Sequence, residues 1–362
     1  MPAVSGGRHL SIALIASARY PIREPFAGGL EAHTWALASA LGRRGHHISL
    51  FAAPGSDPAL GVRELAVHRP RLSAAARADL SMTDPAVLNE HHAYLRLMLD
   101  LADRDGASAY DIVHNNSLHY LPVAMAPAVP APVVTTLHTP PTPWLESAIQ
   151  TGPAGAGVFT AVSRHTARAW QPLVSAARVV HNGVDVHRWT AGPGGGGLVW
   201  YGRIVPEKGP ALAIAAASAA GLPLTLAGPV VDRLYFREQV VPRLGGRVRY
   251  AGHLAGAELA GLVGSARATL VTPCWDEPYG LVVAESLACG TPVCGFDRGA
   301  LGEILTPDCG RLVPYPDVVA LAAAVGEAGG LSRRACRERA ESFCSVEHMT
   351  DRYESLYEEL LS

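Results

Sequence analysis

Short runs of apolar, β-prone residues alternate along the whole chain with longer stretches rich in alanine and leucine. Strands that are buried on both faces of a parallel sheet have this continuous apolar pattern, and the stretches between them have the length of crossover helices. The pattern therefore predicts repeated βαβ units and an α/β fold built on parallel sheets. We find no internal repeat and no apolar run near the length of about 20 residues that spans a bilayer.

The first half of the chain is predicted to form one doubly wound domain over residues 1–191. One helix is predicted over residues 30–42, ending at Gly45, and another from Asp84 as N-cap and Pro85 as first residue to about Asp103. Strands are predicted at residues 10–16, 47–52, 111–114, 133–138, 158–162 and 178–181.

Residues 192–197, with the sequence Gly-Pro-Gly-Gly-Gly-Gly, predict an irregular hinge because glycine loses much conformational freedom in regular structure. The alternation restarts after them and predicts a second Rossmann-like domain over residues 198–344. Its strands are expected at residues 198–201, 222–227, 248–251, 268–272, 292–296 and 311–313. Ligands of such sheets bind at the carboxyl ends of the strands, so we expect a cleft between two facing domains.

The chain ends in a predicted helix over residues of about 345–362, where one face is apolar and should pack on another surface. That face contains Tyr353, Leu356, Tyr357, Leu360 and Leu361.

Charge and cysteine content narrow the function classes. The 362 residues contain 30 Lys and Arg against 32 Asp and Glu, which gives a net charge of −2 and argues against a nucleic-acid partner. None of the six cysteines forms a C-x-x-C pair, so reduced thiols are expected. No signal-peptide pattern is recognised, and we predict a cytoplasmic, non-spanning protein.

Only one of the 30 basic residues is lysine, and it lies in the first candidate segment. This segment, residues 201–209 (Tyr-Gly-Arg-Ile-Val-Pro-Glu-Lys-Gly), follows a predicted strand and precedes a predicted helix. Arg203 and Lys208 are therefore expected in a loop that faces the cleft, where two cations could hold a diphosphate. The alternative is a solvated surface arginine with a lysine at a helix start.

The second candidate segment is residues 276–285 (Asp-Glu-Pro-Tyr-Gly-Leu-Val-Val-Ala-Glu), again between a strand and a helix. Carboxylates accept hydrogen bonds from vicinal diols, so Glu277 and Glu285 could hold sugar or ribose hydroxyls. Free N–H groups near Gly280 and Leu281 would point at a phosphate. For Glu285 the alternative is a glutamate on a solvated helix face.

Two further features lie at predicted strand ends in the first half. Gly28 and Gly29 precede the first helix and would let a ligand approach the backbone, although they do not form the G-x-G-x-x-G fingerprint of nicotinamide cofactors. His138 ends a strand, where anchoring a loop is the alternative to catalysis. The segment His-Asn-Gly-Val-Asp at residues 181–185 is interpreted as a turn, since Asn-Gly accommodates positive φ.

Other chemistries have no sequence support. The chain lacks a P-loop, a Gly-x-Ser-x-Gly elbow and a His-Glu-x-x-His motif. Asp103 and Asp105 have the spacing of a Mn²⁺-binding pair, but they lie at a predicted helix end and are interpreted as a solvated last turn. We predict no metal site and no cofactor.

In chain order, the Gly-Gly-x-Glu loop, the strand-end His138, the Asn-Gly-Val-Asp turn, the Gly-Arg-x4-Lys-Gly segment and the Glu277-x7-Glu285 segment resemble glycosyltransferase family 4. The resemblance spans nearly the whole chain. It implies a GT-B fold whose last helix crosses back to the first domain, a nucleotide-diphosphate sugar as donor and a retaining, metal-independent reaction. UDP-sugars are favoured over GDP-sugars.

The same resemblance implies roles for individual residues. Arg203 and Lys208 would bind the donor diphosphate, and Glu285 would hold the ribose. The transferred sugar would contact Glu277 and His138. The donor-binding surface would be completed by Gly28, Gly29, Tyr279, Gly280 and Leu281, although Tyr279 stands where phenylalanine is common in the family.

Two other functions stay open: a nucleotide-sugar epimerase of the same fold, which would act without an acceptor, and a non-catalytic sugar-nucleotide sensor. The acceptor, a small molecule, a glycan or a lipid, is expected on the first domain. Membrane contact would follow only from a lipid acceptor. The basic residues Arg63, His68, Arg69, Arg71 and Arg77 are interpreted as a solvated face.

Overall fold

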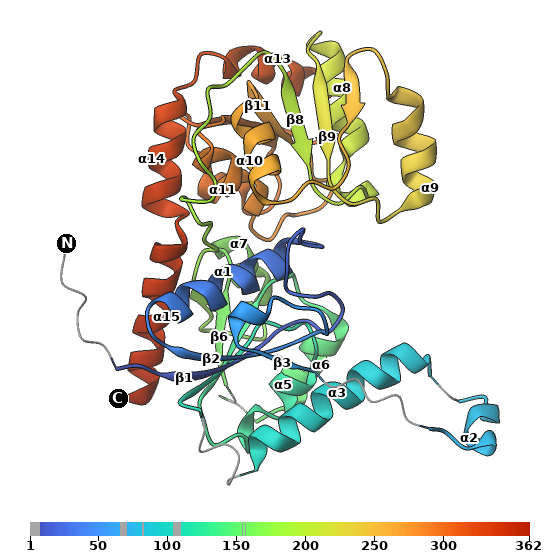
Figure 1. Cartoon of the computed structure of the whole chain (residues 1–362), viewed down its shortest axis with the longest axis vertical. Helices are drawn as coiled ribbons and strands as arrows, with labels where there is room; N and C mark the ends of the chain where they lie inside the picture. The colour runs from blue at the N-terminus through green and yellow to red at the C-terminus, as the bar shows by residue number, and fades with distance from the viewer. Residues whose placement is uncertain (1–7, 66–70, 82, 104–109, 154, 156) are drawn as a thin grey trace.

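Two parallel β-sheets organise the protein in the computed structural model, which describes residues 8–65, 71–81, 83–103, 110–153, 155 and 157–362 (Figure 1). Each sheet has helices on both faces, and each belongs to one half of the chain. The α/β, two-domain fold predicted from the sequence is confirmed.

The first sheet has the strand order β3-β2-β1-β4-β5-β6-β7, and every neighbouring pair is parallel. This is the doubly wound order, which reverses direction beside β1. Its strands are β1 Ser11–Ile15, β2 His47–Ala52, β3 Val62–Glu64, β4 Ile112–Asn115, β5 Val133–Leu137, β6 Val158–Ala161 and β7 Arg178–Val179. The main helices are α1 Gly29–Arg43, α2 Ala74–Ala78, α3 Pro85–Ala102, α5 Leu121–Ala124, α6 Pro143–Thr151 and α7 Arg164–Trp170.

The second sheet repeats that topology with the order β10-β9-β8-β11-β12-β13. Its strands are β8 Leu198–Tyr201, β9 Leu224–Ala227, β10 Val248–Tyr250, β11 Ala268–Val271, β12 Val293–Phe296 and β13 Gly310–Val313. Its helices are α8 Pro210–Ala219, α9 Arg233–Tyr235, α10 Gly256–Gly264, α11 Leu281–Ala288, α12 Leu301–Ile304, α13 Val318–Ala328 and α14 Arg333–Phe343.

The last helix, α15 Val346–Leu361, returns to the first domain as expected. In Figure 1, α14 and α15 form one red column along the side of both domains. The apolar face of α15 enters the core of the first domain, where Tyr353 and Tyr357 have no exposed surface. The core of the first domain is therefore the surface on which the predicted apolar face of the last helix packs.

Every predicted strand is present with ends within two residues, and so are both predicted helices of the first half. Asp84 caps α3 by accepting a hydrogen bond from the Ala86 N–H at 2.7 Å. The edge strand β3 was not predicted because three half-exposed residues show no periodicity. The helix end near Asp103 is confirmed, while Asp105 lies outside the described residues, as do His68 and Arg69.

The prediction of a turn at residues 181–185 is wrong: the segment contains no turn, and Val184 forms a parallel β-bridge with Ser345. Gly183 does not have a positive φ. A Cβ on Gly183 would lie 2.5 Å from the Val346 Cα, so glycine is needed where the returning chain passes. The Val184 N–H donates to the Cys344 carbonyl at 2.7 Å, and the Val346 N–H donates to the Val184 carbonyl at 3.0 Å.

The glycine run 192–197 is irregular, as predicted, but it is packed rather than free. The Gly194 N–H donates to the Gly264 carbonyl at 2.9 Å, and Arg333 donates to the carbonyls of Gly192 and Gly264. A Cβ on Gly192 would approach the Gly264 carbonyl oxygen to 2.4 Å. These contacts fix the chain where it leaves the first domain.

Candidate functional site

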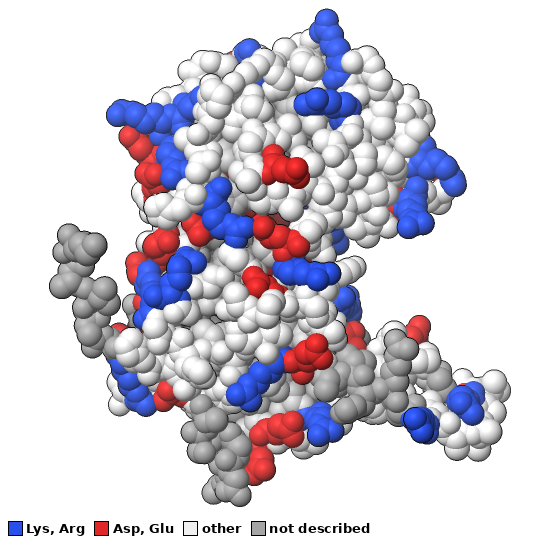
Figure 2. All heavy atoms as spheres, in the orientation of Figure 1, with Lys and Arg blue, Asp and Glu red and all other residues white. Residues whose placement is uncertain are grey.

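Loops that follow strands of both sheets meet at the boundary between the domains, where Gly29 lies against Leu281 and the Phe26 carbonyl oxygen lies 3.2 Å from His253. Figure 2 shows side chains of both charges gathered along this boundary. Figure 2 also shows a notch between the second domain and the projecting arm formed by α2 and α3. The loops that follow the strands of both sheets therefore line this boundary, and they contain the predicted site residues.

Lys208 and Glu277 form an ion pair that the sequence did not predict. The Lys208 ammonium donates to both carboxylate oxygens of Glu277, at 2.9 and 2.6 Å. The Trp275 indole N–H donates to one of the same oxygens at 3.2 Å, and its ring lies 5.1 Å from the ammonium. The side chains are only 22% and 15% exposed, so the charges are partly desolvated.

Two loops hold this pair in place. Gly209 follows Lys208 with φ +64°, where a Cβ would overlap the Thr272 carbonyl oxygen at 2.1 Å. The Thr272 hydroxyl donates to the Gly209 carbonyl at 2.8 Å. On the other side, the Ala300 N–H donates to the Glu277 carbonyl at 2.8 Å. The two catalytic candidates are therefore presented by fixed backbone.

Arg203 extends from the same loop toward the first domain. Its guanidinium lies 3.8 Å from Glu207, and its side chain is 40% exposed, so that pair contributes little. Burial raises the pKa of Glu31 in α1, while its own backbone N–H and the charge of Arg203 act in the opposite direction. Arg203 is therefore a cation that is available at the domain boundary.

Two helix N-termini converge beside these cations. Helix α1 starts at Gly29, where an added Cβ would lie 3.2 Å from the Leu281 Cδ1, and α11 starts at Leu281. Gly280 caps α11 with φ +103°, a left-handed conformation that favours glycine. The first N–H groups of a helix have no intrahelical partner and attract anions. Gly29 thus lies close to Leu281 across the boundary.

Glu285 lies in α11 and is a poorly solvated carboxylate. The pKa of Glu285 is raised to about 7: burial is the largest cause, a hydrogen bond with Tyr201 opposes it, and the charge of Glu24 from the first domain adds to it. An acid with this pKa is about half protonated at neutral pH.

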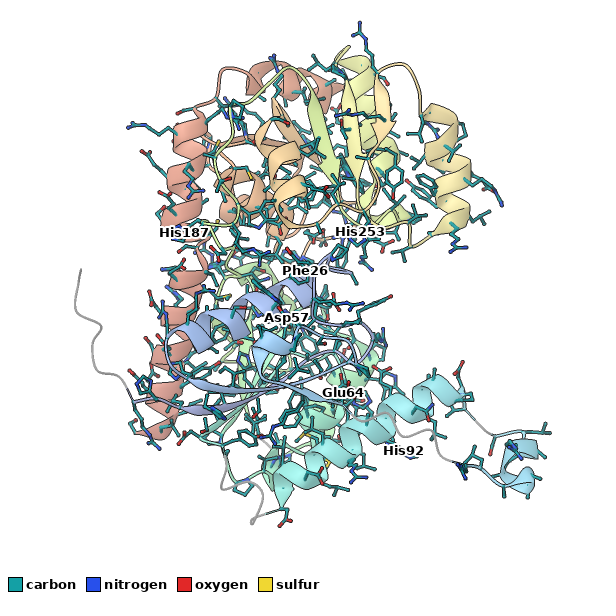
Figure 3. All side chains as sticks on the ribbon, viewed as in Figure 1. Phe26, Asp57, Glu64, His92, His187 and His253 are labelled. Carbon is teal, nitrogen blue, oxygen red and sulfur yellow. The ribbon has the colours of Figure 1, made fainter. Side chains whose placement is uncertain are left out.

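Glu24 belongs to a loop that bridges the domains. Its carboxylate pairs with Arg188 at 2.8 Å. Further along the same loop, the Phe26 carbonyl oxygen lies 3.2 Å from Nε2 of His253, which belongs to the second domain. Figure 3 shows Phe26 and His253 facing each other across the boundary. The cleft is therefore partly closed on this side.

His138 follows β5 and is a neutral imidazole. Its Nε2 lies 2.8 Å from the Asn116 Oδ1, and its ring lies edge-on to His33 with 4.8 Å between centroids. Burial lowers the pKa of His138 well below its usual value, and the neighbouring His33 and His114 lower it further. His138 can accept or donate a hydrogen bond here, but it supplies no charge.

The Tyr279 side chain lies elsewhere than predicted, since it was expected to form part of the donor-binding surface. Its ring is only 2% exposed and packs in the core that joins the domains, near His181. The ring therefore belongs to the interior, and only the Tyr279 backbone is left to face a donor.

Sequence reasoning missed Trp275 and Asn116, which touch Glu277 and His138. Trp275 adjoins the carboxylate in sequence, which was an available signal. Asn116 comes from another strand end, and the sequence had no signal for it.

No three His, Cys, Asp or Glu side chains within the described residues are grouped to hold a metal ion. Over the same residues no helix is both long enough and apolar enough to cross a bilayer.

The two facing parallel-sheet domains with a helix that returns to the first are those of the GT-B fold. Two family models match the chain, Glycosyltransferase Family 4 over residues 27–188 and Glycosyl transferases group 1 over residues 195–328. The first domain thus matches the family 4 model and the second domain the group 1 model; both are glycosyltransferase families, and the protein is a transferase enzyme.

Two similar proteins align with most of the chain. A glycogen synthase of Mycobacterium tuberculosis is 28% identical over 350 residues, which cover 82% of this chain and 81% of the relative. A phosphatidyl-myo-inositol mannosyltransferase of Mycolicibacterium smegmatis is 29% identical over 326 residues, with 82% and 80% covered.

Solved structures confirm the fold. AviGT4, a glycosyltransferase involved in avilamycin A biosynthesis, has a TM-score of 0.69 and 25% identity, with 97% of this chain and 98% of that chain covered. Anabaena HepE in complex with UDP-glucose has a TM-score of 0.75 at 17% identity, with 97% and 100% covered, and shows a common fold.

Proposed function

We propose that this glycosyltransferase moves a hexose-type sugar from a nucleotide-diphosphate donor to an acceptor bound on the first domain, with retention of configuration and without a metal. The observation that carries the proposal is the convergence of Lys208, Arg203 and the N-termini of α1 and α11 at the domain boundary. Fixed cations and free amides are suited to a diphosphate, and they favour the charge that develops on it as the sugar leaves.

The chemistry proposed is stabilisation of the leaving group, followed by attack of the acceptor on the same face of the sugar. Glu277 is a weak candidate nucleophile because Lys208 and Trp275 already occupy its oxygens. Neutral His138 would hydrogen-bond a sugar hydroxyl near the reacting carbon. The departing diphosphate would then take the acceptor's proton.

The donor is proposed to be a UDP-sugar, with GDP-sugars as the competing class. One relative, matched at 32% identity over 143 residues, is a GDP-mannose-dependent mannosyltransferase of Mycobacterium tuberculosis, which makes GDP-mannose the necessary comparison. We propose a cytoplasmic location, since the six cysteines are free thiols. Membrane contact is proposed only for the case of a lipid acceptor.

A thermal-shift screen tests the proposal. A donor that binds only the native state raises the melting temperature in proportion to RT ln(1 + [L]/Kd). We expect UDP-sugars or GDP-sugars to raise it and the nucleosides alone to have little effect. If no nucleotide sugar raises it, the proposed function is wrong. Turnover of a bound donor without any acceptor to an epimeric nucleotide sugar would identify an epimerase, and tight binding without turnover would identify a sensor.

A further inference from the structure

The first domain carries a stack of aromatic rings that the proposed donor site does not use. Trp144 is 64% exposed and lies parallel to Tyr120, with 5.0 Å between ring centroids. Tyr120 stacks on His119 at 4.9 Å, and His119 stacks on Tyr94 at 4.3 Å. We call these four residues the aromatic stack. All six tryptophans lie among the described residues, and Trp144 alone has such an exposed ring.

The aromatic stack lies on the side of the first sheet where the strands end, which is also the side that carries His138. His119 and Tyr120 follow β4, and Trp144 begins the helix after β5. Trp144 lies six positions after His138, so their Cα atoms are at most about 20 Å apart. Helices α3, marked by His92 in Figure 3, and α6 lie on the first-domain side of the notch in Figure 2.

Hydrogen bonds hold the buried end of the aromatic stack in place. The Tyr94 hydroxyl donates to the Ala16 carbonyl and accepts from the Ala18 N–H, both at 2.9 Å. The pKa of His119 is lowered to about 4, chiefly by burial and in addition by nearby His91 and Arg19. Its ring is therefore neutral at physiological pH. Binding on a surface that is already ordered avoids the entropy cost of fixing side chains.

Tyr120 and His91 give the stack a polar edge. The Tyr120 hydroxyl lies 3.1 Å from His91 Nδ1, and the two rings are stacked at 5.9 Å. A flat aromatic face packs well against the C–H face of a pyranose ring, and hydroxyl and imidazole groups beside it can bond the sugar hydroxyls. An acyl chain could not form hydrogen bonds with these polar groups.

We propose that the aromatic stack is an acceptor subsite that holds a saccharide unit, with Trp144 as the platform for one sugar ring. The chain allows up to about 20 Å between His138 and Trp144, so a saccharide unit on Trp144 and the reacting hydroxyl near His138 can belong to one oligosaccharide or glycan chain, which is the acceptor we expect. This inference rests on the proposed function, because it concerns the acceptor of the same reaction.

Fluorine NMR of the full chain labelled with 5-fluorotryptophan tests the subsite directly. The resonance that disappears in Trp144→Phe belongs to Trp144. We expect maltotriose or α-1,6-linked mannobiose to shift this resonance saturably. Trp144→Ala lacks this reporter, so its affinity for the same sugar is compared with that of the unmodified protein by isothermal titration calorimetry. It should fall about tenfold, the order expected from loss of a stacked ring. Trp144→Phe should retain most of it, as should Val319→Ala, which truncates a 78% exposed side chain on the second domain.

The proposal is overturned if neither saccharide moves the Trp144 resonance, if Trp144→Ala binds as well as the unmodified protein, or if only phosphatidylinositol vesicles move it. Melting shifts with UDP-glucose and GDP-mannose separate this failure from failure of the proposed function. If a donor raises the melting temperature and no saccharide binds, only the subsite is wrong. If neither donor raises it, the proposed function itself fails.

Discussion

Replacing Glu285 by glutamine should stabilise the free protein and weaken donor binding. The carboxylate of Glu285 has its pKa raised from 4.5 to about 7, chiefly by burial. Glutamine has nearly the same shape but carries no charge, so Glu285→Gln removes the desolvation cost and keeps the packing. The same change takes away the carboxylate proposed to accept hydrogen bonds from the ribose.

The size of the stability change follows from the rise in the pKa of Glu285 from 4.5 to about 7, since each unit of pKa corresponds to 1.36 kcal/mol. The native state holds the proton more tightly than the unfolded state. Stability is therefore lost as pH rises from about 4.5 to about 7, and the loss reaches about 3 kcal/mol above that range. Part of the Glu285 surface lies open to solvent, so this figure is an upper bound.

The assay compares the melting temperature of Glu285→Gln with that of the unmodified protein at pH 5 and pH 8.5. We expect the variant to melt several degrees higher at pH 8.5, and the difference to shrink at pH 5. Donor affinity at pH 8.5 should fall roughly 10- to 100-fold, because a hydrogen bond to a charged group contributes about 1.5–3 kcal/mol.

Glu303 provides the matched control with the opposite sign. Burial alone would raise its pKa, but the His181 side chain and the N–H groups of Arg164 and His165 outweigh burial and lower the pKa of Glu303 to about 2. Glu303 therefore stabilises the protein above about pH 4.5, and Glu303→Gln should lower the melting temperature at pH 8.5. If Glu285→Gln lowers it as well, or raises it equally at both pH values, the reasoning on desolvation is refuted.

Three further variants test the cleft. Arg203→Ala should lower the kcat/KM for the donor about 100-fold with an unchanged melting temperature, because its exposed side chain makes no strong contact; an unchanged kcat/KM would exclude its assigned contact. Lys208→Arg should keep the pairing with Glu277 but lower kcat at saturating donor, since a planar guanidinium replaces a compact ammonium; full activity would contradict the placement. Gly280→Ala should lose about 1–3 kcal/mol of stability by urea unfolding, because φ is +103° and the new Cβ would meet Leu301 at 2.5 Å; equal stability would mean that the cap relaxes freely.

The sequence predicted the strands well because strands buried on both faces must be mostly apolar, as in residues 198–201 and 268–271. Helix starts with a side-chain cap were also recognisable, as at Asp84. By contrast, β3 is too short and exposed to show a period, and Gly183 is needed for a contact with Val346, which is 163 positions away in the chain.

The candidate site was predictable as a set of loops but not as a set of contacts. Strand-to-helix loops placed Lys208 and Glu277 at the correct edge, because parallel strands bring their carboxyl ends together. Their ion pair joins residues 69 positions apart and has no local pattern. The burial of the Tyr279 ring is likewise a tertiary effect, since an aromatic residue in a loop can face either the cleft or the core.

The claim that cations at the mouth of the second domain hold a diphosphate is tested most directly at Lys208. This residue has the chain's only ε-amine, so an amine-selective reagent followed by mass spectrometry reports its accessibility without mutation. UDP or GDP should reduce labelling of Lys208 several-fold, whereas uridine and guanosine, which lack the diphosphate, should not. Labelling that is the same with and without the diphosphates would contradict the account.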